Sequence, residues 1–199
     1  MKILVSNVGS TSLKFKLYEM PQEKVLCKGK VERVGSPDDA IFLYENLLTG
    51  ERVDEICGIP GYTEGIRRFT GCMTDAWIGV LSGLEELDGI GFKTVAAKGY
   101  YGVHEITAEV LDAMEAFMII APAHNRAYLE AIGCFRKVLP QTRFIGVFET
   151  AFHQTIPAKR SLYSLPPVSQ RLSASPPHGI LSKDLLQLLS LMQVSAFFS

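Results

Sequence analysis

Apolar and polar residues alternate along the first part of the chain in the manner of β-strands. Residues 2–8, 14–18 and 24–34 carry β-branched and aromatic residues at alternate positions, and turn residues separate one run from the next. A turn-like cluster follows at 35–39, and a further apolar run lies at 41–44. The pattern predicts a β-meander at the start of the chain.

Further along the chain the apolar spacing becomes helical. Residues 62–73, a segment that begins after Thr107, and residues 125–139 each carry apolar residues three or four positions apart. Thr107 is a suitable N-cap, and the last of these segments stops before a proline. Short apolar runs at 90–95 and 143–148 predict strands. Strands first, then helices and returning strands, predict an α/β fold with a mixed β-sheet flanked by helices.

Composition and charge narrow the classes of partner. The 199 residues are 47% hydrophobic, which is enough for one domain with a sizeable core. The net charge of -1, with both signs interspersed, offers no broad basic face for a nucleic acid, so a small molecule is the expected partner. The four cysteines lie far apart and lack metal-ligand spacing, which favours reduced thiols in a cytoplasmic protein.

Two kinds of segment are not expected in this sequence. The chain begins directly with a strand pattern and has no long apolar run before a cleavage site, so we expect no secretory signal. No run reaches the roughly 18 to 20 apolar residues that a membrane span requires. We therefore expect no membrane association.

The turn between the first two predicted strands carries candidate chemistry. It reads NVGSTSLK at residues 7–14. Backbone N–H groups of a glycine-containing turn, together with hydroxyl groups and a nearby lysine, suit phosphate oxygens. Asn7 offers a neutral oxygen to a Mg²⁺-bound water. Any β-hairpin also favours Asn, Gly and Ser at its turn, so this loop by itself leaves both interpretations open.

Two later motifs place further polar groups at the ends of predicted elements. APAHN, at 121–125, opens a helix, and FETAFH, at 148–153, follows a strand. In this order the three motifs resemble the acetokinase family of the sugar kinase, heat-shock ATPase and actin superfamily, in which A-P-x-H-N precedes a helix and F-D-T-A-F-H comes later. The resemblance covers Met1 to about Pro166.

The resemblance implies a fold and a reaction. The fold is the ribonuclease H-like lobe of actin-type ATPases, and family members contain two such domains, form homodimers and hold the active site between the domains. The reaction is ATP-dependent, Mg²⁺-assisted transfer of phosphate to acetate, which gives acetyl phosphate and ADP in organic acid metabolism.

The resemblance also assigns roles to individual positions. Asn7 would contact the metal, and Ser10, Ser12 and Lys14 would lie near the nucleotide phosphates. Lys93 and His124 would bind the substrate, and Glu149 would stand at the place of the family's catalytic acid. Each has a structural alternative, since His124 could simply cap its helix and Lys14 could be a solvated strand residue.

The sequence departs from the family pattern at the substrate positions. Where the family has G-H-R-V-V-H-G-G, Lys93 replaces the arginine, and Phe92 and Ala96 replace both histidines. Lysine keeps the charge but lacks the planar fork that grips a carboxylate. Glu149 replaces an aspartate and is one methylene longer. A smaller side chain at Ala96 could enlarge the acyl pocket, so a propionate or butyrate kinase remains an alternative.

The end of the sequence departs further. Residues 166–199 contain only three charged residues, Arg171, Lys183 and Asp184, and lack the family motif Y-G-x-R-R-Y-G-F-H-G-x-S-H that is expected there. We interpret 1–165 as an amino-terminal lobe and 166–199 as an aberrant tail that arose by a frameshift or an internal deletion. The expected kinase is then impaired, and a non-catalytic acyl- or phosphate-binding remnant is the alternative.

Overall fold

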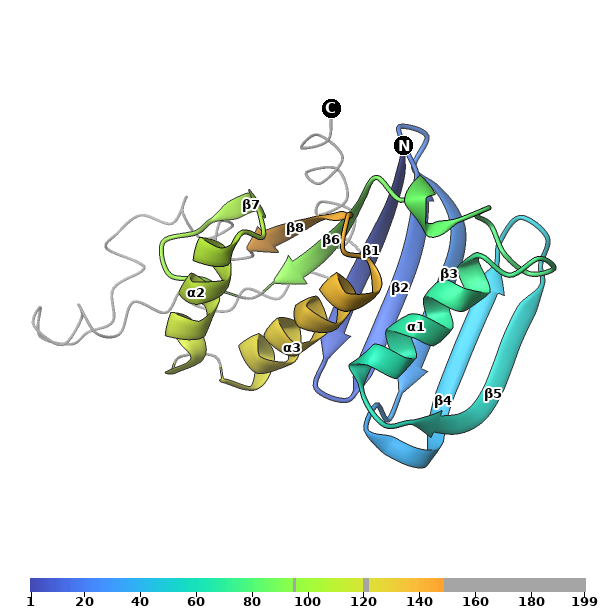
Figure 1. Cartoon of the computed structure of the whole chain (residues 1–199), viewed down its shortest axis with the longest axis horizontal. Helices are drawn as coiled ribbons and strands as arrows, with labels where there is room; N and C mark the ends of the chain where they lie inside the picture. Colours follow the sequence, from blue (N-terminus) through green and yellow to red (C-terminus); the bar gives the residue numbers. More distant parts are fainter. Residues whose placement is uncertain (95, 120–121, 149–199) are drawn as a thin grey trace, which may run out of the picture.

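A mixed β-sheet forms the body of the molecule. The computed structural model describes residues 1–94, 96–119 and 122–148, and its strands lie in the order β5-β4-β3-β2-β1-β6-β8-β7 (Figure 1). The strands are β1 (Lys2–Gly9), β2 (Ser12–Glu19), β3 (Lys24–Glu32), β4 (Ser36–Asn46), β5 (Arg52–Ile59), β6 (Gly89–Thr94), β7 (Gly102–Glu105) and β8 (Arg143–Phe148).

Strand β1 joins two halves of different topology. On one side, β1 to β5 pair antiparallel in chain order, as the predicted meander requires. On the other side, β1 pairs parallel with β6, and β6 pairs parallel with β8, while β7 runs antiparallel along β8. The run Ile3-Leu4-Val5 is buried, with Leu4 in the main core and Ile3 and Val5 in a second cluster. A strand that is apolar on both sides suits the centre of a sheet.

The helices are α1 (Tyr62–Met73), α2 (Ala108–Ala116) and α3 (Pro122–Val138), with short 3₁₀ turns η1 (Leu84–Glu86) and η2 (Phe117–Ile119). Helices α1 and α3 lie side by side on one face of the sheet and pack against each other (Figure 1). The α2 N-cap is Thr107, whose hydroxyl accepts a hydrogen bond from Val110 N at 3.4 Å. The predicted cap is therefore confirmed.

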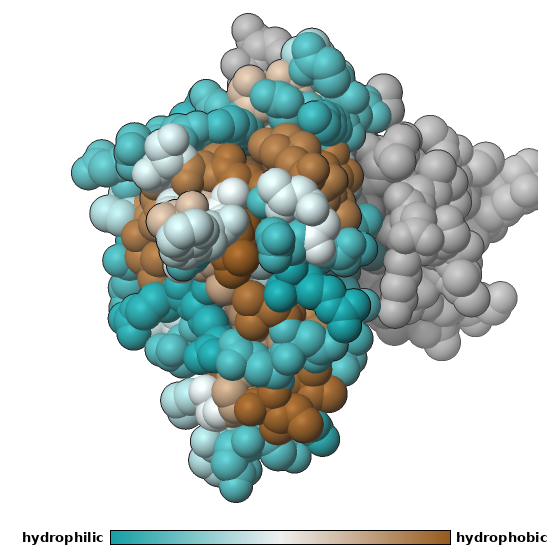
Figure 2. Space-filling model, turned by 90° about the vertical axis from the view of Figure 1, so that its right-hand side faces the viewer, coloured by the Kyte–Doolittle hydropathy of each residue, from teal (hydrophilic) through white to brown (hydrophobic). Residues whose placement is uncertain are grey.

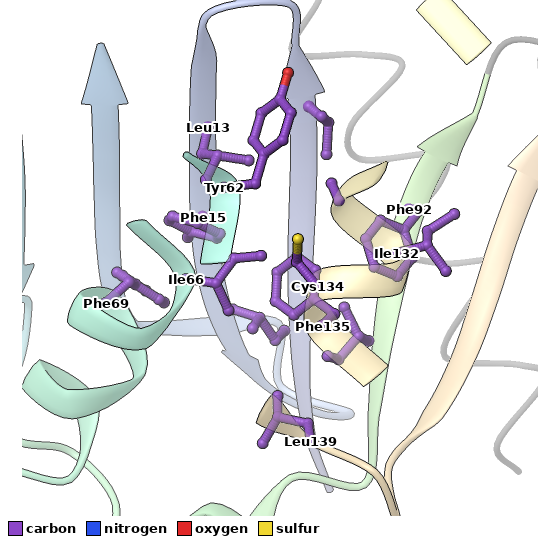
Figure 3. Packing of buried hydrophobic residues seen from close by; sticks show 14 of the residues in the cluster. Leu13, Phe15, Tyr62, Ile66, Phe69, Phe92, Ile132, Cys134, Phe135 and Leu139 are labelled. Carbon is purple, nitrogen blue, oxygen red and sulfur yellow. The ribbon is translucent and has the colours of Figure 1, made fainter. Parts of the chain in front are cut away.

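Aromatic side chains connect the sheet to the helices (Figure 3). Phe15 of β2 stacks on Phe69 of α1 with ring centroids 4.3 Å apart. Phe135 of α3 meets the edges of Phe15 and Phe92 at 6.2 and 5.3 Å. Phe92 is fully buried in this cluster, so its ring is part of the core.

The predicted elements agree with the structure except in three places. The cluster at 35–39 is predicted as a turn, but β4 already begins at Ser36, because a bulge between Ser36 and Ala40 allows turn-type residues to join the strand. The sequence pattern also does not predict strands β5 and β7. Strand β5 carries charged residues on both faces, and β7 has four half-buried residues, so neither shows a clear apolar alternation.

Strand β5 forms one edge of the sheet, and Figure 2 shows the molecule from that side. Apolar side chains there lie in patches that polar residues separate. Ile56 on β5 is 71% exposed, and Leu47 and Leu48 in the preceding turn are also exposed. Charged residues on the same strand oppose pairing with another chain.

The part of the chain that the structure describes contains neither a membrane-spanning helix nor a disulfide. No helix in this part of the chain is both long enough and apolar enough to cross a membrane. All four cysteines lie within it, and each is a free thiol.

Candidate functional site

The carboxyl ends of β1, β6 and β8 meet at one edge of the parallel half of the sheet. Ser6 pairs with Phe92 and Lys93 pairs with Val147 in the observed register. Asn7 follows Ser6 on β1, and Lys93 follows Phe92 on β6. The two residues therefore lie at the same level on neighbouring strands. Ligands of open α/β sheets bind beyond such carboxyl ends.

The turn between β1 and β2 is a tight hairpin. Gly9 pairs with Ser12, which leaves Ser10 and Thr11 as the two turn residues. A Cβ atom at Gly9 would stand 2.6 Å from Ser12 Oγ, so the Ser12 hydroxyl lies directly beside Gly9 and would have to rotate away from a larger residue. Ser10 is exposed and Ser12 is half-buried, so the hydroxyl of Ser10 faces solvent while that of Ser12 lies against the turn. The sequence by itself is compatible with either a simple hairpin turn or a phosphate-binding loop. The observed turn is a two-residue hairpin, and its polar groups lie at the same edge of the sheet as Asn7.

A buried tyrosine holds the backbone of this hairpin. The hydroxyl of Tyr62, at the start of α1, lies 2.7 Å from the Gly9 carbonyl oxygen and 3.0 Å from the Ser10 carbonyl oxygen. Its ring is directed along the core toward the turn (Figure 3). Burial raises the pKa of Tyr62, so the phenol stays protonated and donates.

A second tyrosine contacts Asn7. The hydroxyl of Tyr128, on α3, donates to Asn7 Oδ1 at 3.4 Å. Tyr128 is buried, and burial raises its pKa well above the ordinary value. Asn7 is half-buried at the end of β1, with its amide oxygen oriented by this contact. Sequence reasoning misses both tyrosines, because each acts on a residue far away along the chain.

Lysine side chains line a hollow next to Asn7. A cavity of about 530 Å³ is bordered by Asn7, Lys14, Lys16, Lys28, Lys30 and Arg52, among other residues. Lys14 and Lys16 alternate with residues of the main core, so they lie on the sheet face opposite α1 and α3. Lys14 stands directly across from Lys30, and Lys16 from Lys28. Like charges in such positions disfavour the bare sheet, and an anionic ligand would relieve them.

Carboxylates neutralise part of that charge. Glu45 pairs with Lys28 at 2.8 Å, and Glu32 pairs with Lys30. The pKa of Glu32 is lowered, first by its hydrogen bond with Lys30 and also by the charge of Lys14. Glu45 is the one carboxylate among the described residues that border the cavity, so positive charge prevails there.

The other predicted site residues are Lys93, His124 and Glu149. Lys93 is half-buried on β6 and lies next to Val147 of β8. The side chain of His124 and the whole of Glu149 lie outside the described part of the chain. The neighbour of His124, Asn125, is fully buried, and its Nδ2 donates to the carbonyl oxygens of Ala96 and Met114 at 3.0 and 2.9 Å. Asn125 therefore ties α3 to the segment that follows β6.

The oxygen donors of the loop suit a magnesium ion. Mg²⁺ prefers hard oxygens, keeps several waters and usually takes only one or two protein ligands together with phosphate. The Asn7 amide oxygen and the hydroxyls of Ser10 and Ser12 are donors of that kind. Across residues 1–94, 96–119 and 122–148, no three His, Cys, Asp or Glu side chains are grouped as a metal cage. These residues would therefore hold the ion through Asn7 and bound phosphate.

Known proteins match most of this chain. Residues 2–173 match the model of the Acetokinase family. Acetate kinases from Geobacillus sp. (strain WCH70) and Bacillus subtilis (strain 168) are 42% and 39% identical over 166 residues, which is 83% of this chain and 41% of each relative. The chain thus spans about two fifths of the length of the curated relatives that it matches.

Solved structures share the fold. Porphyromonas gingivalis acetate kinase superposes with a TM-score of 0.80 at 34% identity, over 90% of this chain and 45% of that one. A propionate kinase from Francisella tularensis superposes with a TM-score of 0.79 at 23% identity, over 95% of this chain and 49% of that one. The second likeness bears on the fold alone. The predicted α/β, actin-type lobe is confirmed.

Proposed function

Because the chain belongs to the acetokinase family, we propose that it serves ATP-dependent transfer of phosphate to acetate, with acetyl phosphate and ADP as products. An oxygen of the acetate carboxylate attacks the γ-phosphorus of ATP, and the bond from that phosphorus to the bridging oxygen of ADP breaks. Such a transfer depends on positioning and on neutralising the charge of the moving phosphoryl group.

The meeting of the carboxyl ends of β1 and β6 is the observation that carries this proposal. It puts Asn7 and Lys93 at one level, beside the hairpin that contains Ser10, Ser12 and Lys14. A phosphate would lie against the hairpin while a carboxylate lies against the end of β6. Excess positive charge in the adjoining cavity supports an anionic ligand.

The roles of the residues follow from this arrangement. Asn7 would hold Mg²⁺, which when bound neutralises charge on the phosphates. Ser10, Ser12 and Lys14 would bind the nucleotide phosphates, and Lys93 and His124 would bind the acetate. Glu149, which follows Phe148 in the sequence, would be the acid or base near the reacting oxygens. Cytoplasmic location and homodimer formation are part of the same proposal.

The substrate test is hydroxamate trapping of acetyl phosphate with the full 199-residue chain, ATP, Mg²⁺ and acetate. We expect little turnover from this chain by itself, because its sequence lacks the histidine- and arginine-rich family motif that supplies further charge. Ordinary turnover would contradict that expectation. Parallel assays with propionate and butyrate decide the acyl chain length.

A binding measurement tests the site independently of turnover. Calorimetric titration with acetyl phosphate and Mg²⁺ is expected to give heat in the wild type and much less in Lys14→Met. Lys137→Met on α3 is the matched control, because it removes the same charge away from the hairpin. If the wild type gives neither heat nor trapped product, the proposed function is wrong.

A further inference from the structure

Two buried tyrosines, from two different helices, form hydrogen bonds with the β1–β2 hairpin and with Asn7 just before it. Tyr62 comes from the first turn of α1, and Tyr128 comes from the middle of α3. Both rings belong to the main core, so they reach the hairpin from its inner side. Each hydroxyl is within hydrogen-bond distance of the hairpin or of Asn7 just before it.

The contact of Tyr62 fixes the direction of two peptide groups. The carbonyl oxygens of Gly9 and Ser10 both point to the same phenol oxygen, at 2.7 and 3.0 Å. In a planar trans peptide, the N–H group points opposite to the carbonyl. The N–H groups of Ser10 and Thr11 therefore point away from Tyr62, toward the outside of the hairpin. Two adjacent N–H groups that point the same way form a concavity for an anion.

The next peptide is held in the same manner. The carbonyl oxygen of Thr11 accepts a hydrogen bond from Val34 N at 3.0 Å. The carbonyls of Gly9 and Ser10 share the single O–H of Tyr62, and that of Thr11 accepts from Val34, so three consecutive carbonyls are engaged by the protein. The turn cannot rotate its carbonyls outward, where they would repel a phosphate, without breaking these bonds.

The contact of Tyr128 fixes the orientation of an amide. The hydroxyl of Tyr128 donates its proton to Asn7 Oδ1 at 3.4 Å. Only the oxygen end of an asparagine amide accepts such a proton. The Asn7 amide is therefore held with its oxygen at the position of the Tyr128 contact, and one lone pair of that oxygen is left for another partner.

The geometry points to Tyr62 and Tyr128 as positioning residues of this site. Tyr62 aims the amides of Ser10 and Thr11 at the phosphate oxygens, and Tyr128 presents the Asn7 oxygen to Mg²⁺. The inference rests on the phosphate role proposed above, and it predicts that the two tyrosines affect separate properties.

The experiment removes each hydroxyl and measures anion affinity with and without metal. Inorganic tripolyphosphate is the probe, titrated calorimetrically into the full chain in the presence and absence of Mg²⁺. Loss of the hydrogen bond in Tyr62→Phe should raise the dissociation constant about 3- to 10-fold under both conditions. Tyr128→Phe should leave the Mg²⁺-free constant unchanged and reduce the gain in affinity that Mg²⁺ provides.

Thr70→Val is the control. Thr70 is buried on α1, and its hydroxyl donates to the backbone carbonyl oxygen of Arg67 at 3.0 Å. It follows Tyr62 by eight residues of the same helix, which is about 12 Å along the helix axis. The control loses a hydrogen bond from a buried hydroxyl to a backbone carbonyl, and it should bind tripolyphosphate like the wild type with or without Mg²⁺.

Backbone amide NMR of the wild type gives a second readout that needs no variant. The amide signals of Ser10 and Thr11 should shift when tripolyphosphate is added, and the side-chain amide of Asn7 should shift when Mg²⁺ follows. Unchanged signals, or a Tyr62→Phe variant that binds as well as the wild type, would overturn the positioning role. A wild type that does not bind tripolyphosphate at all would instead refute the proposed phosphate site.

Discussion

Gly29 faces the ring of Phe69, and Gly29→Ala is expected to destabilise the protein. A Cβ atom at this position would lie 2.5 Å from Phe69 Cδ2 and 3.0 Å from the carbonyl oxygen of Leu43. Ordinary contacts between carbon atoms are about 3.5–4.0 Å, so the ring or the strand must move by about 1 Å. Phe69 is fully buried and stacks on Phe15 at 4.3 Å, which blocks its retreat. Overpacking of this kind costs about 1–3 kcal/mol.

A control and a double mutant separate the clash from other effects of the substitution. Gly71→Ala makes the same change in α1, where a Cβ would meet nothing within 4 Å, and it should stabilise the protein by about 0.5–1 kcal/mol. Phe69→Leu removes the ring from the path of the new methyl group. In the double mutant the cost of Gly29→Ala should fall by about 0.5–3 kcal/mol, which is the range for residues in contact.

The assay is urea denaturation followed by far-UV circular dichroism. Fluorescence is a poor probe of the core here, because Trp77 is 88% exposed. The reasoning is refuted if Gly29→Ala is as stable as Gly71→Ala, or if the costs of Gly29→Ala and Phe69→Leu simply add.

Three further predictions follow from buried or paired groups. The pKa of Asp75 is lowered by hydrogen bonds from the backbone N–H groups of Trp77 and Ile78. The contribution of Asp75 to stability is therefore present above its unfolded pKa of 3.8 and is lost as the pH falls through its lower folded pKa. The urea midpoint of Asp75→Asn should fall less than that of the wild type between about pH 7 and pH 3. Asn125→Ala should cost about 1–3 kcal/mol, because the Ala96 carbonyl loses the Asn125 amide while the Met114 carbonyl keeps the backbone N–H of Phe117. An unchanged urea midpoint would contradict this. Burial raises the pKa of Cys27 to about 12, so a thiol reagent near pH 8 should label this residue only in the denatured chain.

Local patterns predict the elements, while long-range contacts make the site. Helix α1 was predicted with its observed bounds, because its buried positions recur at helical spacing within one short segment. Strand β5 was missed because its charged residues hide the alternation. The hydrogen bonds of the hairpin join Tyr62 to Gly9, 53 residues away, and Tyr128 to Asn7, 121 residues away. Spacing along a sequence cannot reveal such partners, although it does reveal the loop that they hold.

The position of β1 between the two halves of the sheet sets the order in which the fold can be completed during synthesis. Strands β1 to β5 pair with their neighbours in sequence, so this meander can form as soon as it leaves the ribosome. The second edge of β1 must wait for β6, which begins only at Gly89. Until then the run Ile3-Leu4-Val5 presents an unpaired apolar edge, and slow translation between residues 60 and 89 should increase the tendency of the nascent chain to associate.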